Sequence, residues 1–529
     1  MTRLSFAAAV FPIVALTAAP ARAAEASGWF EAGREAVARA RRIEATRDPG
    51  ARAKNVILFL ADGMGLSTST AARILEGQLR GESGEENWLS FERFPHTGLL
   101  KTYNTNQQTP DSAGTMTAIV TGVKTRAGAI SVDETVAHGD HTGVAGHRLA
   151  TIVEQAEDRG LSTGIVTTTT VTHATPAACY AHSADRGWQD DSWLSEAARA
   201  AGFPDIARQL VEFSHGDGLE VALGGGRTHF LPADTPDPEH PHLTGSRLDG
   251  RNLPAEWVAR RANATYVWNR EQFEAVEATD SLLGLFEASD MHFEIDREAD
   301  AAGEPSLTEM TAKAIELLSR NPRGYLLMVE GGRIDHGHHL GNAHRALSET
   351  IEFSRAVQAA RDATDPRETL IVVSADHSHG LTIGGYPTRG NDILGRVVNN
   401  DSRGEPKPEP AVDARGRPYT TLRYHDGPGA VVGEVVWPKA SSSGQRRWPG
   451  IRARFGWLDR RPDSQGVDTA DPDYLQHAPV ALFGETHAGE DVAVYALGPG
   501  AWLFRCVQEQ NYLYHAMVEA LGWTREPSR

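Results

Sequence analysis

Four runs of apolar and β-branched residues along the chain predict strands that are buried on both faces. These runs cover residues 55–60, 162–172, 324–329 and 369–374. Continuous rather than alternating apolar character is typical of parallel strands that helices cover on both sides. Segments with helical spacing separate the runs, at about residues 147–159, 307–320 and 343–362. The alternation predicts an α/β fold with a large, mostly parallel central sheet flanked by helices on both faces.

Three regions depart from this alternation. Residues 24–53 are rich in Ala, Arg and Glu, and we expect an N-terminal helix or arm there. Residues 227–305 are rich in Pro, Asp and Glu, which favours an elaborated surface loop region. Residues 383–475 contain many Gly, Pro and Arg, and we interpret them as a subdomain inserted into a main domain that spans residues 54–529.

The first residues have the pattern of a secretory signal peptide. Arg3 supplies a positive charge, residues 4–19 are mostly apolar and carry no charge, and residues 21–23 (Ala-Arg-Ala) form a cleavage site. We therefore expect residues 1–23 to be removed on export, so that the mature protein is periplasmic or secreted. The apolar run is short for a membrane span and the C-terminal end is polar, so no stable membrane anchor is expected.

Composition narrows the classes of partner. The formal net charge of −18 argues against a nucleic acid or an anionic membrane. An anionic substrate would need local positive charge, and 21 His with 70 Asp and Glu offer ample ligands for metal ions. The two cysteines, Cys179 and Cys506, are too few for a disulfide framework. One disulfide and two separately buried thiols both fit the sequence.

Residue types that bind metals follow the buried runs. Asp62 follows the first run, His173 the second, Glu330 the third, and the pair Asp376-His377 the fourth. In parallel sheets, ligands bind beyond the carboxyl ends of the strands. A capping or solvated role explains any one of these residues alone, but their joint occurrence predicts a shared site.

The segment after Glu330 adds two more ligand types. Asp335 and His339 are four residues apart, so a helix would place both on one face. Mixed carboxylate and imidazole ligands suit zinc with an open catalytic position. A solvated His-rich loop is the alternative for this segment by itself.

A nucleophile is available at Ser112, in the sequence TPDSAGT. Asp111 or Ser112 can cap a helix that begins here, and a helix N-terminus favours an anion beside the hydroxyl. A capping serine without chemistry fits the local sequence equally well. The neighbouring metal-type residues favour the nucleophile.

Longer stretches identify a family. They are ILFLADGMG, TPDSAGTMTA, THATPAACYAHSADRGW, YVWNR, LLSRNPRGYLLMVEGGRIDHGHH, SADHSHG, GGYPTRG and ETHAGEDVAVYALGPGA. Through them the chain resembles alkaline phosphatases over nearly its full mature length, and especially the animal-type branch. The resemblance implies hydrolysis of small phosphate monoesters to an alcohol and inorganic phosphate, through a phosphoserine intermediate. It also implies a homodimer in which residues 383–475 form a crown-like subdomain near the interface.

The resemblance assigns residues to a site with two zinc ions and one magnesium ion. The first zinc set is Asp335, His339 and His487. The second zinc set is Asp62, Asp376 and His377. The magnesium set is Asp62, Thr175 and Glu330. Ser112 would be the nucleophile and Arg186 the phosphate clamp, while His173 and His336 would lie beside the metal ligands as in the animal-type branch.

A calcium site outside the active centre is also implied. Its ligands would be Glu239, the carbonyl of Phe286, Glu287 and Glu304. Glu304 stands where the animal-type branch has Asp, after a short insertion, which leaves the fourth ligand open. An acidic surface loop that binds nothing tightly is the alternative.

Two other functions compete with the phosphomonoesterase. One is a zinc-dependent phosphodiesterase or sulfatase of the same superfamily, against which Ser112 together with Arg186 argues. The other is a non-catalytic metalloprotein that binds phosphate. The sequence does not identify a physiological substrate.

Overall fold

The computed structural model describes residues 50–430 and 463–523, with isolated stretches between residues 35 and 48 and two short strands at 433–436 and 450–453. The chain divides into two compact units, Met1–Asp48 and Pro49–Arg529. The predicted signal peptide lies outside the described residues, as does most of the predicted N-terminal arm. Among the described residues, no helix has both the length and the apolar character that a membrane crossing requires.

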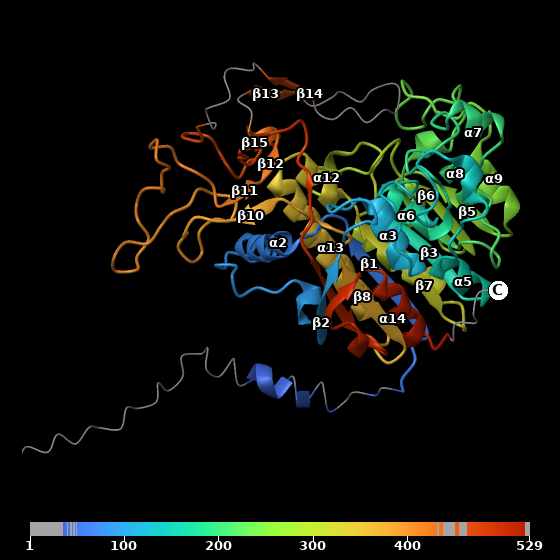
Figure 1. Ribbon diagram of the computed structural model, residues 1–529, viewed down its shortest axis with the longest axis horizontal. Coiled ribbons are helices and arrows are strands. Elements are labelled where there is room, and N and C mark those ends of the chain that lie inside the picture. Colours follow the sequence, from blue (N-terminus) through green and yellow to red (C-terminus); the bar gives the residue numbers. More distant parts are fainter. Residues whose placement is uncertain are drawn as a thin grey trace, which may run out of the picture. The chain divides into compact units, whose positions relative to one another are not determined.

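Ten strands form one central sheet in the second unit (Figure 1). Across the sheet they are β18 (Cys506–Glu509), β2 (His96–Lys101), β17 (Val492–Leu497), β8 (Thr369–Ser374), β1 (Asn55–Ala61), β7 (Tyr325–Gly331), β3 (Ser162–Thr170), β4 (Val221–Gly225), β6 (Ser281–Leu285) and β5 (Ala264–Val267). Only β17 runs antiparallel to its neighbours. The four predicted strands are β1, β3, β7 and β8, which lie side by side and are almost fully buried. The α/β fold with a mostly parallel sheet is therefore confirmed.

Helices cover both faces of this sheet (Figure 1). One group is α2 (Leu66–Leu79), α11 (Leu307–Leu318), α12 (Arg333–His339) and α13 (Ala343–Ala363). The other group is α3 (Ser112–Thr121), α5 (Ile152–Asp158), α6 (Ala174–Tyr180) and α14 (Tyr512–Ala520). The shorter helices are α4 (His141–Val144), α7 (Glu196–Ala200), α8 (Ile206–Val211), α9 (Leu253–Arg260) and α10 (Arg270–Glu274). Phe353 of α13 packs edge-on against Phe59 of β1, with ring centroids 5.8 Å apart, and so fixes the helix layer to the central strand.

The expectation of a surface loop region over residues 227–305 is wrong in part. This region contains β5 and β6, which extend the central sheet at one edge. The apolar side chains of β6 are fully buried, but the strand has only five residues and acidic loops flank it. A short run in a region dominated by Asp, Glu and Pro does not stand out by composition.

Small two-stranded sheets lie outside the central sheet. The first pairs β10 (Leu381–Ile383) with β11 (Leu422–Tyr424), the second β12 (Asp426–Gly427) with β15 (Val480–Ala481), the third β13 (Gly433–Val436) with β14 (Gly450–Ala453), and the fourth β9 (Ser378–His379) with β16 (His487–Ala488). β11, β12, β13 and β14 lie within the predicted insertion, residues 383–475, whose boundaries stay a prediction. The pairing of β9 with β16 carries His487 back from beyond the insertion to the end of β8.

The two cysteines are not paired. Cys179 is buried in α6, and Cys506 is exposed on the edge strand β18; both are free thiols. Of the two alternatives, the separate thiols are the correct one, although only Cys179 is buried.

Two acidic side chains are enclosed at the amino-terminal side of β3 and β4. Glu157 ends α5 and Glu220 precedes β4; the Thr163 hydroxyl donates to Glu157 over 2.5 Å and the Thr163 amide donates to Glu220 over 2.7 Å. Burial, together with the charge of Glu220, raises the pKa of Glu157 to about 9. Burial also raises the pKa of Glu220 to about 7.

Replacing Glu157 by Gln is expected to reduce the loss of stability at alkaline pH. An unfolded glutamate releases its proton near pH 4.3, whereas folded Glu157 keeps it up to about pH 9. Between these values the folded state binds more protons, so stability falls as the pH rises. Thermal melts between about pH 6 and about pH 10 should show a smaller decrease in melting temperature for Glu157→Gln than for the wild type. An equal decrease would mean that Glu157 does not cause the pH dependence.

Candidate metal centre

The central strands end at one rim and deliver the metal-type residues there. In the registers of β1 with its two neighbours, Leu60 lies opposite Glu330 of β7 and Ser374 of β8. Asp62 lies two residues after Leu60, and Asp376 lies two residues after Ser374. The adjacency of these strands in the sheet, which the sequence does not state, is what brings the residues together.

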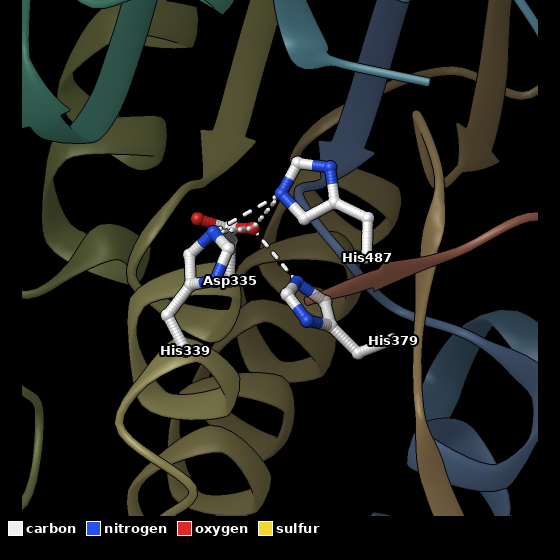
Figure 2. Close-up of side chains that lie close together, drawn as sticks. All are labelled: Asp335, His339, His379 and His487. Atoms are coloured by element: carbon white, nitrogen blue, oxygen red, sulfur yellow. Dashed lines mark hydrogen bonds and ion pairs between the residues drawn. The ribbon is translucent and has the colours of Figure 1, made fainter. Parts of the chain in front are cut away.

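The first zinc set forms a tight group (Figure 2). The Oδ1 atom of Asp335 lies 3.3 Å from Nε2 of His339 and 3.2 Å from Nε2 of His487. Asp335 lies in the first turn of α12 and His339 is its last residue, four residues on, so the expected shared helix face is present.

The two imidazoles of this set, when both are neutral, present lone pairs to each other. His339 donates from Nδ1 to the carbonyl of Glu485 over 2.6 Å, and His487 donates from Nδ1 to the carbonyl of Pro110 over 2.8 Å. In the neutral ring the other nitrogen then carries no proton. The two Nε2 atoms are nevertheless 3.0 Å apart. Burial lowers the pKa of His339 to about 4, so this ring is neutral. A cation between the two nitrogens resolves this repulsion, and zinc fits the donors.

His379 is a residue of this centre that the sequence analysis missed. Its Nε2 donates to Oδ1 of Asp335 over 2.7 Å, and its Nδ1 contacts Oε2 of Glu485 (Figure 2). Both ring nitrogens are therefore committed to carboxylates, and neither is free to bind a metal. Burial opposes the charged ring, but Glu485 and Asp335 raise the pKa of His379 to about 10. His379 thus orients the ligand Asp335. The sequence signal was its place two residues after His377 in SADHSHG.

The second zinc set surrounds the hydroxyl of Ser112. Nε2 of His377 lies 3.3 Å from Oγ of Ser112, 3.4 Å from Oδ1 of Asp62 and 3.2 Å from Oδ2 of Asp376. Neither carboxylate oxygen of Asp62 has a hydrogen-bond partner, although the side chain is fully buried. A buried carboxylate without donors is costly unless a cation binds it.

The magnesium set lies next to the second zinc set. Asp62, His173 and Glu330 bring one ligand atom each within 4.8 Å of one another. Oε1 of Glu330 has no hydrogen-bond partner, while Oε2 accepts from Thr167 and Thr169. Burial raises the pKa of Glu330 to about 7. Thr175, the remaining predicted ligand, is fully buried, and its hydroxyl oxygen has no partner within hydrogen-bonding distance.

Repulsion among the buried acids argues independently for cations. The pKa of Asp62 is raised well above its usual range, first by burial and then by the charges of Asp376, Asp335 and Glu330. Four buried carboxylates cannot all ionise in this volume unless positive charge is supplied. The donor sets therefore fit the divalent cations that the sequence analysis assigned to them.

Asp111 connects the predicted nucleophile, Ser112, to the predicted phosphate clamp, Arg186. Its Oδ1 accepts from the Gly114 amide over 3.2 Å and so caps α3, which begins at Ser112. Its Oδ2 accepts from Nη1 of Arg186 over 3.0 Å. The sequence analysis had named Asp111 only as a possible cap.

Two further arginine–histidine contacts lie at the centre. Nη2 of Arg186 donates to Nε2 of His173 over 2.9 Å, and Nη1 of Arg333 donates to Nδ1 of His336 over 2.7 Å. The rings of His173 and His336 meet edge to face at 5.8 Å. Because a guanidinium only donates, the acceptor nitrogen of each ring carries no proton.

A second acidic cluster lies away from the catalytic rim. Glu239 and Glu287, two of the predicted calcium ligands, lie close together with His240. Glu287 and Glu304 lie close together with His292 and Asp300. The last two residues were not predicted. Ion pairing with Glu287 and Glu304 raises the pKa of His292 to about 10.

Comparisons with known proteins agree with this geometry. A family model described as alkaline phosphatase matches residues 53–523. The alkaline phosphatase tissue-nonspecific isozyme of Gallus gallus is 44% identical over 510 residues, which are 95% of this chain and 90% of the relative. The human isozyme of that name is 42% identical over 477 residues, 88% of this chain and 83% of the relative. The solved structure of Thermus thermophilus alkaline phosphatase has a TM-score of 0.62 at 25% identity, and covers 90% of this chain and 93% of its own.

The chain belongs to the alkaline phosphatase family. It is a phosphoric monoester hydrolase, and phosphate monoesters are its substrates. The family decides between the competing functions in favour of phosphomonoester hydrolysis.

The contacts of His379 lead to a test of metal affinity. His379→Phe keeps the ring but removes both hydrogen bonds, and loss of such an outer contact weakens metal binding roughly 10- to 100-fold. Zinc retention against a chelator should fall accordingly, and excess zinc should restore turnover. His338→Phe is the matched control, because His338 is equally buried and stacks on His379 but bonds to Thr68 and Tyr424. If both variants retain zinc equally, His379 has no role in orienting Asp335.

Proposed function

We propose that the chain hydrolyses phosphate monoesters through a covalent phosphoserine at Ser112, at a site that holds two zinc ions and one magnesium ion. The observation that carries this proposal is the position of the Ser112 hydroxyl, 3.3 Å from Nε2 of His377 and at the start of α3. The first zinc set, the second zinc set and the magnesium set, as defined above, would hold the ions. Bound zinc supplies Lewis acidity, which neutralises phosphate charge and favours ionised oxygen nucleophiles near neutral pH.

The chain's own groups position the substrate. The fork of Arg186 can bind two oxygens of a phosphoryl group, and Asp111 and His173 hold that fork in place from the other side. The N-terminus of α3 favours the same anion. These contacts address only the phosphoryl group, which fits broad specificity among monoesters.

The reaction then has two displacement steps at phosphorus. Ser112 releases its proton to solvent as Oγ bonds to phosphorus, and the bond from phosphorus to the alcohol oxygen breaks. The alcohol oxygen takes a proton from solvent and the alcohol leaves. A water molecule next attacks the phosphorus and releases one proton, the bond between phosphorus and Oγ breaks, and Oγ takes up a proton, which gives inorganic phosphate and free Ser112.

Ser112→Ala is expected to lower kcat on the order of 10³-fold or more, since the covalent route is lost. Metal content should stay unchanged, because Ser112 belongs to none of the ligand sets. Acid quenching of the wild type with labelled substrate should leave label on the peptide that contains Ser112. Thr121→Val, at the other end of the same helix, serves as the control and should keep the label, because the Thr121 hydroxyl bonds only to backbone atoms of Thr117 and Val123. A labelled protein in the Ser112→Ala sample would exclude Ser112 as the nucleophile.

We also propose export of the chain, with a cleaved signal peptide. The support is the charged, apolar and small-residue pattern of residues 1–23. Cleavage after Ala23 would make Ala24 the first residue of the mature protein, which N-terminal sequencing reads directly. The mature protein would then be periplasmic or secreted.

We further propose a homodimer, with the predicted insertion at its interface. Large apolar side chains are exposed in and beside this region, among them Tyr386 at 91% and Phe483 at 69% exposure. Aromatic side chains are enriched at protein interfaces, where they gain burial.

Light scattering is expected to give about twice the mass of one chain for the wild type. Tyr386→Glu is expected to shift the protein towards the monomer, because a charge would enter the apolar contact. Trp193→Glu is the control, an exposed aromatic position outside the insertion. A monomeric wild type, or a dimer that both variants retain, would contradict the proposed interface.

A further inference from the structure

Four carboxylates of the second acidic cluster each leave one oxygen without a hydrogen bond. These buried atoms are Oε1 of Glu239, Oε1 of Glu287, Oδ2 of Asp300 and Oε2 of Glu304. The side chain of Glu304 is 0% exposed and that of Glu287 7%. Buried acceptors without donors indicate an absent cation rather than a solvated acidic loop.

The imidazole of His292 lies among these oxygens. Its Nδ1 is 3.3 Å from Oε1 of Glu287 and 3.6 Å from Oε1 of Glu304. The backbone amide of His292 also donates to Oε1 of Glu304 over 2.8 Å, which fixes that carboxylate against the imidazole. A cation held by Glu287 and Glu304 would replace the proton that these carboxylates hold on His292 and take its Nδ1 as a ligand.

This donor set differs from the one that calcium takes. Calcium binds oxygen ligands and does not favour imidazole. Two carboxylates and one imidazole make the same donor set as Asp62, Asp376 and His377 in the second zinc set. Imidazole suits zinc, copper, iron and nickel, whereas calcium takes carboxylate, carbonyl and water oxygens.

We propose that Glu287, His292 and Glu304 form a third zinc site that selects zinc over calcium. It shares no residue with the catalytic sets. Glu239 and Asp300 supply further negative charge beside it, and Arg227 already occupies Oε2 of Glu239 through a bond of 2.6 Å.

The site joins segments that are distant in the sequence. Glu287 follows β6, His292 lies in the loop after it, and Glu304 precedes α11. An ion bound here would tie that loop at both of its ends and stabilise the folded chain, since only the folded state brings the ligands together.

Metal content of the purified holoenzyme tests the proposal. The protein is dialysed against equal free concentrations of zinc and calcium, freed of unbound ions, and measured by elemental analysis and thermal melting. The wild type should carry one zinc ion per chain more than His292→Gln and should melt at a higher temperature. The two proteins should turn over a phosphate monoester at the same rate. The side chain of His292 is 38% exposed, so the substitution is compatible with folding.

Two further variants sharpen the result. His242→Gln is the control and should keep the wild-type zinc content. The ring of His242 lies 6.0 Å from that of His240, but His242 belongs to none of the metal-type groups among the described residues. Glu304→Gln should lose the third ion whichever metal it is. Three results would each overturn the proposal. They are calcium in place of the third zinc ion in the wild type, an equal zinc content in the wild type and His292→Gln, and the absence of any third ion.

Discussion

The structure depends on one electrostatic constraint, the concentration of buried negative charge at the rim of the sheet. Asp62, Glu330, Asp335 and Asp376 are each at most 4% exposed, and the arginine contacts described above do not neutralise them, since Arg186 pairs with Asp111 and His173 and Arg333 with His336. Carboxylates that are removed from water cost several kcal/mol each when no opposite charge compensates them. Divalent cations supply that charge without filling space with side chains. The fold therefore keeps a set of ligands that is unfavourable when empty, and this makes the site ready for metal.

The sheet meets this constraint through its order of strands rather than through local sequence. β8, β1, β7 and β3 are neighbours, although they are far apart along the chain. Each ends at the same rim, and each has apolar residues along its whole length that hold it between the helix layers. The rigidity of these strands fixes the ligand positions, and the outer contacts of His379, Asp111 and Arg333 fix the side chains that matter for the chemistry.

Much of this arrangement could be predicted from the sequence. Uninterrupted apolar runs identified the central strands, and a spacing of four identified the shared face of Asp335 and His339. Long matching stretches identified the family. Local patterns could not predict which side chains position the metal ligands and the phosphate clamp without touching metal or substrate themselves. His379 and Asp111 look like ordinary loop and capping residues until the fold places them against Asp335 and Arg186. β6 was missed because acidic loops on both sides hid a run of five residues. His292 was missed because only the fold places it beside Glu287 and Glu304.

The central claim is that chain-distant acids and imidazoles at the rim hold two zinc ions beside Ser112. Anomalous diffraction from crystals of the holoenzyme, collected on both sides of the zinc absorption edge, tests this claim most directly. The account predicts one zinc peak among Asp335, His339 and His487, and a second among Asp62, Asp376 and His377. A rim without zinc peaks in a fully active enzyme would contradict it.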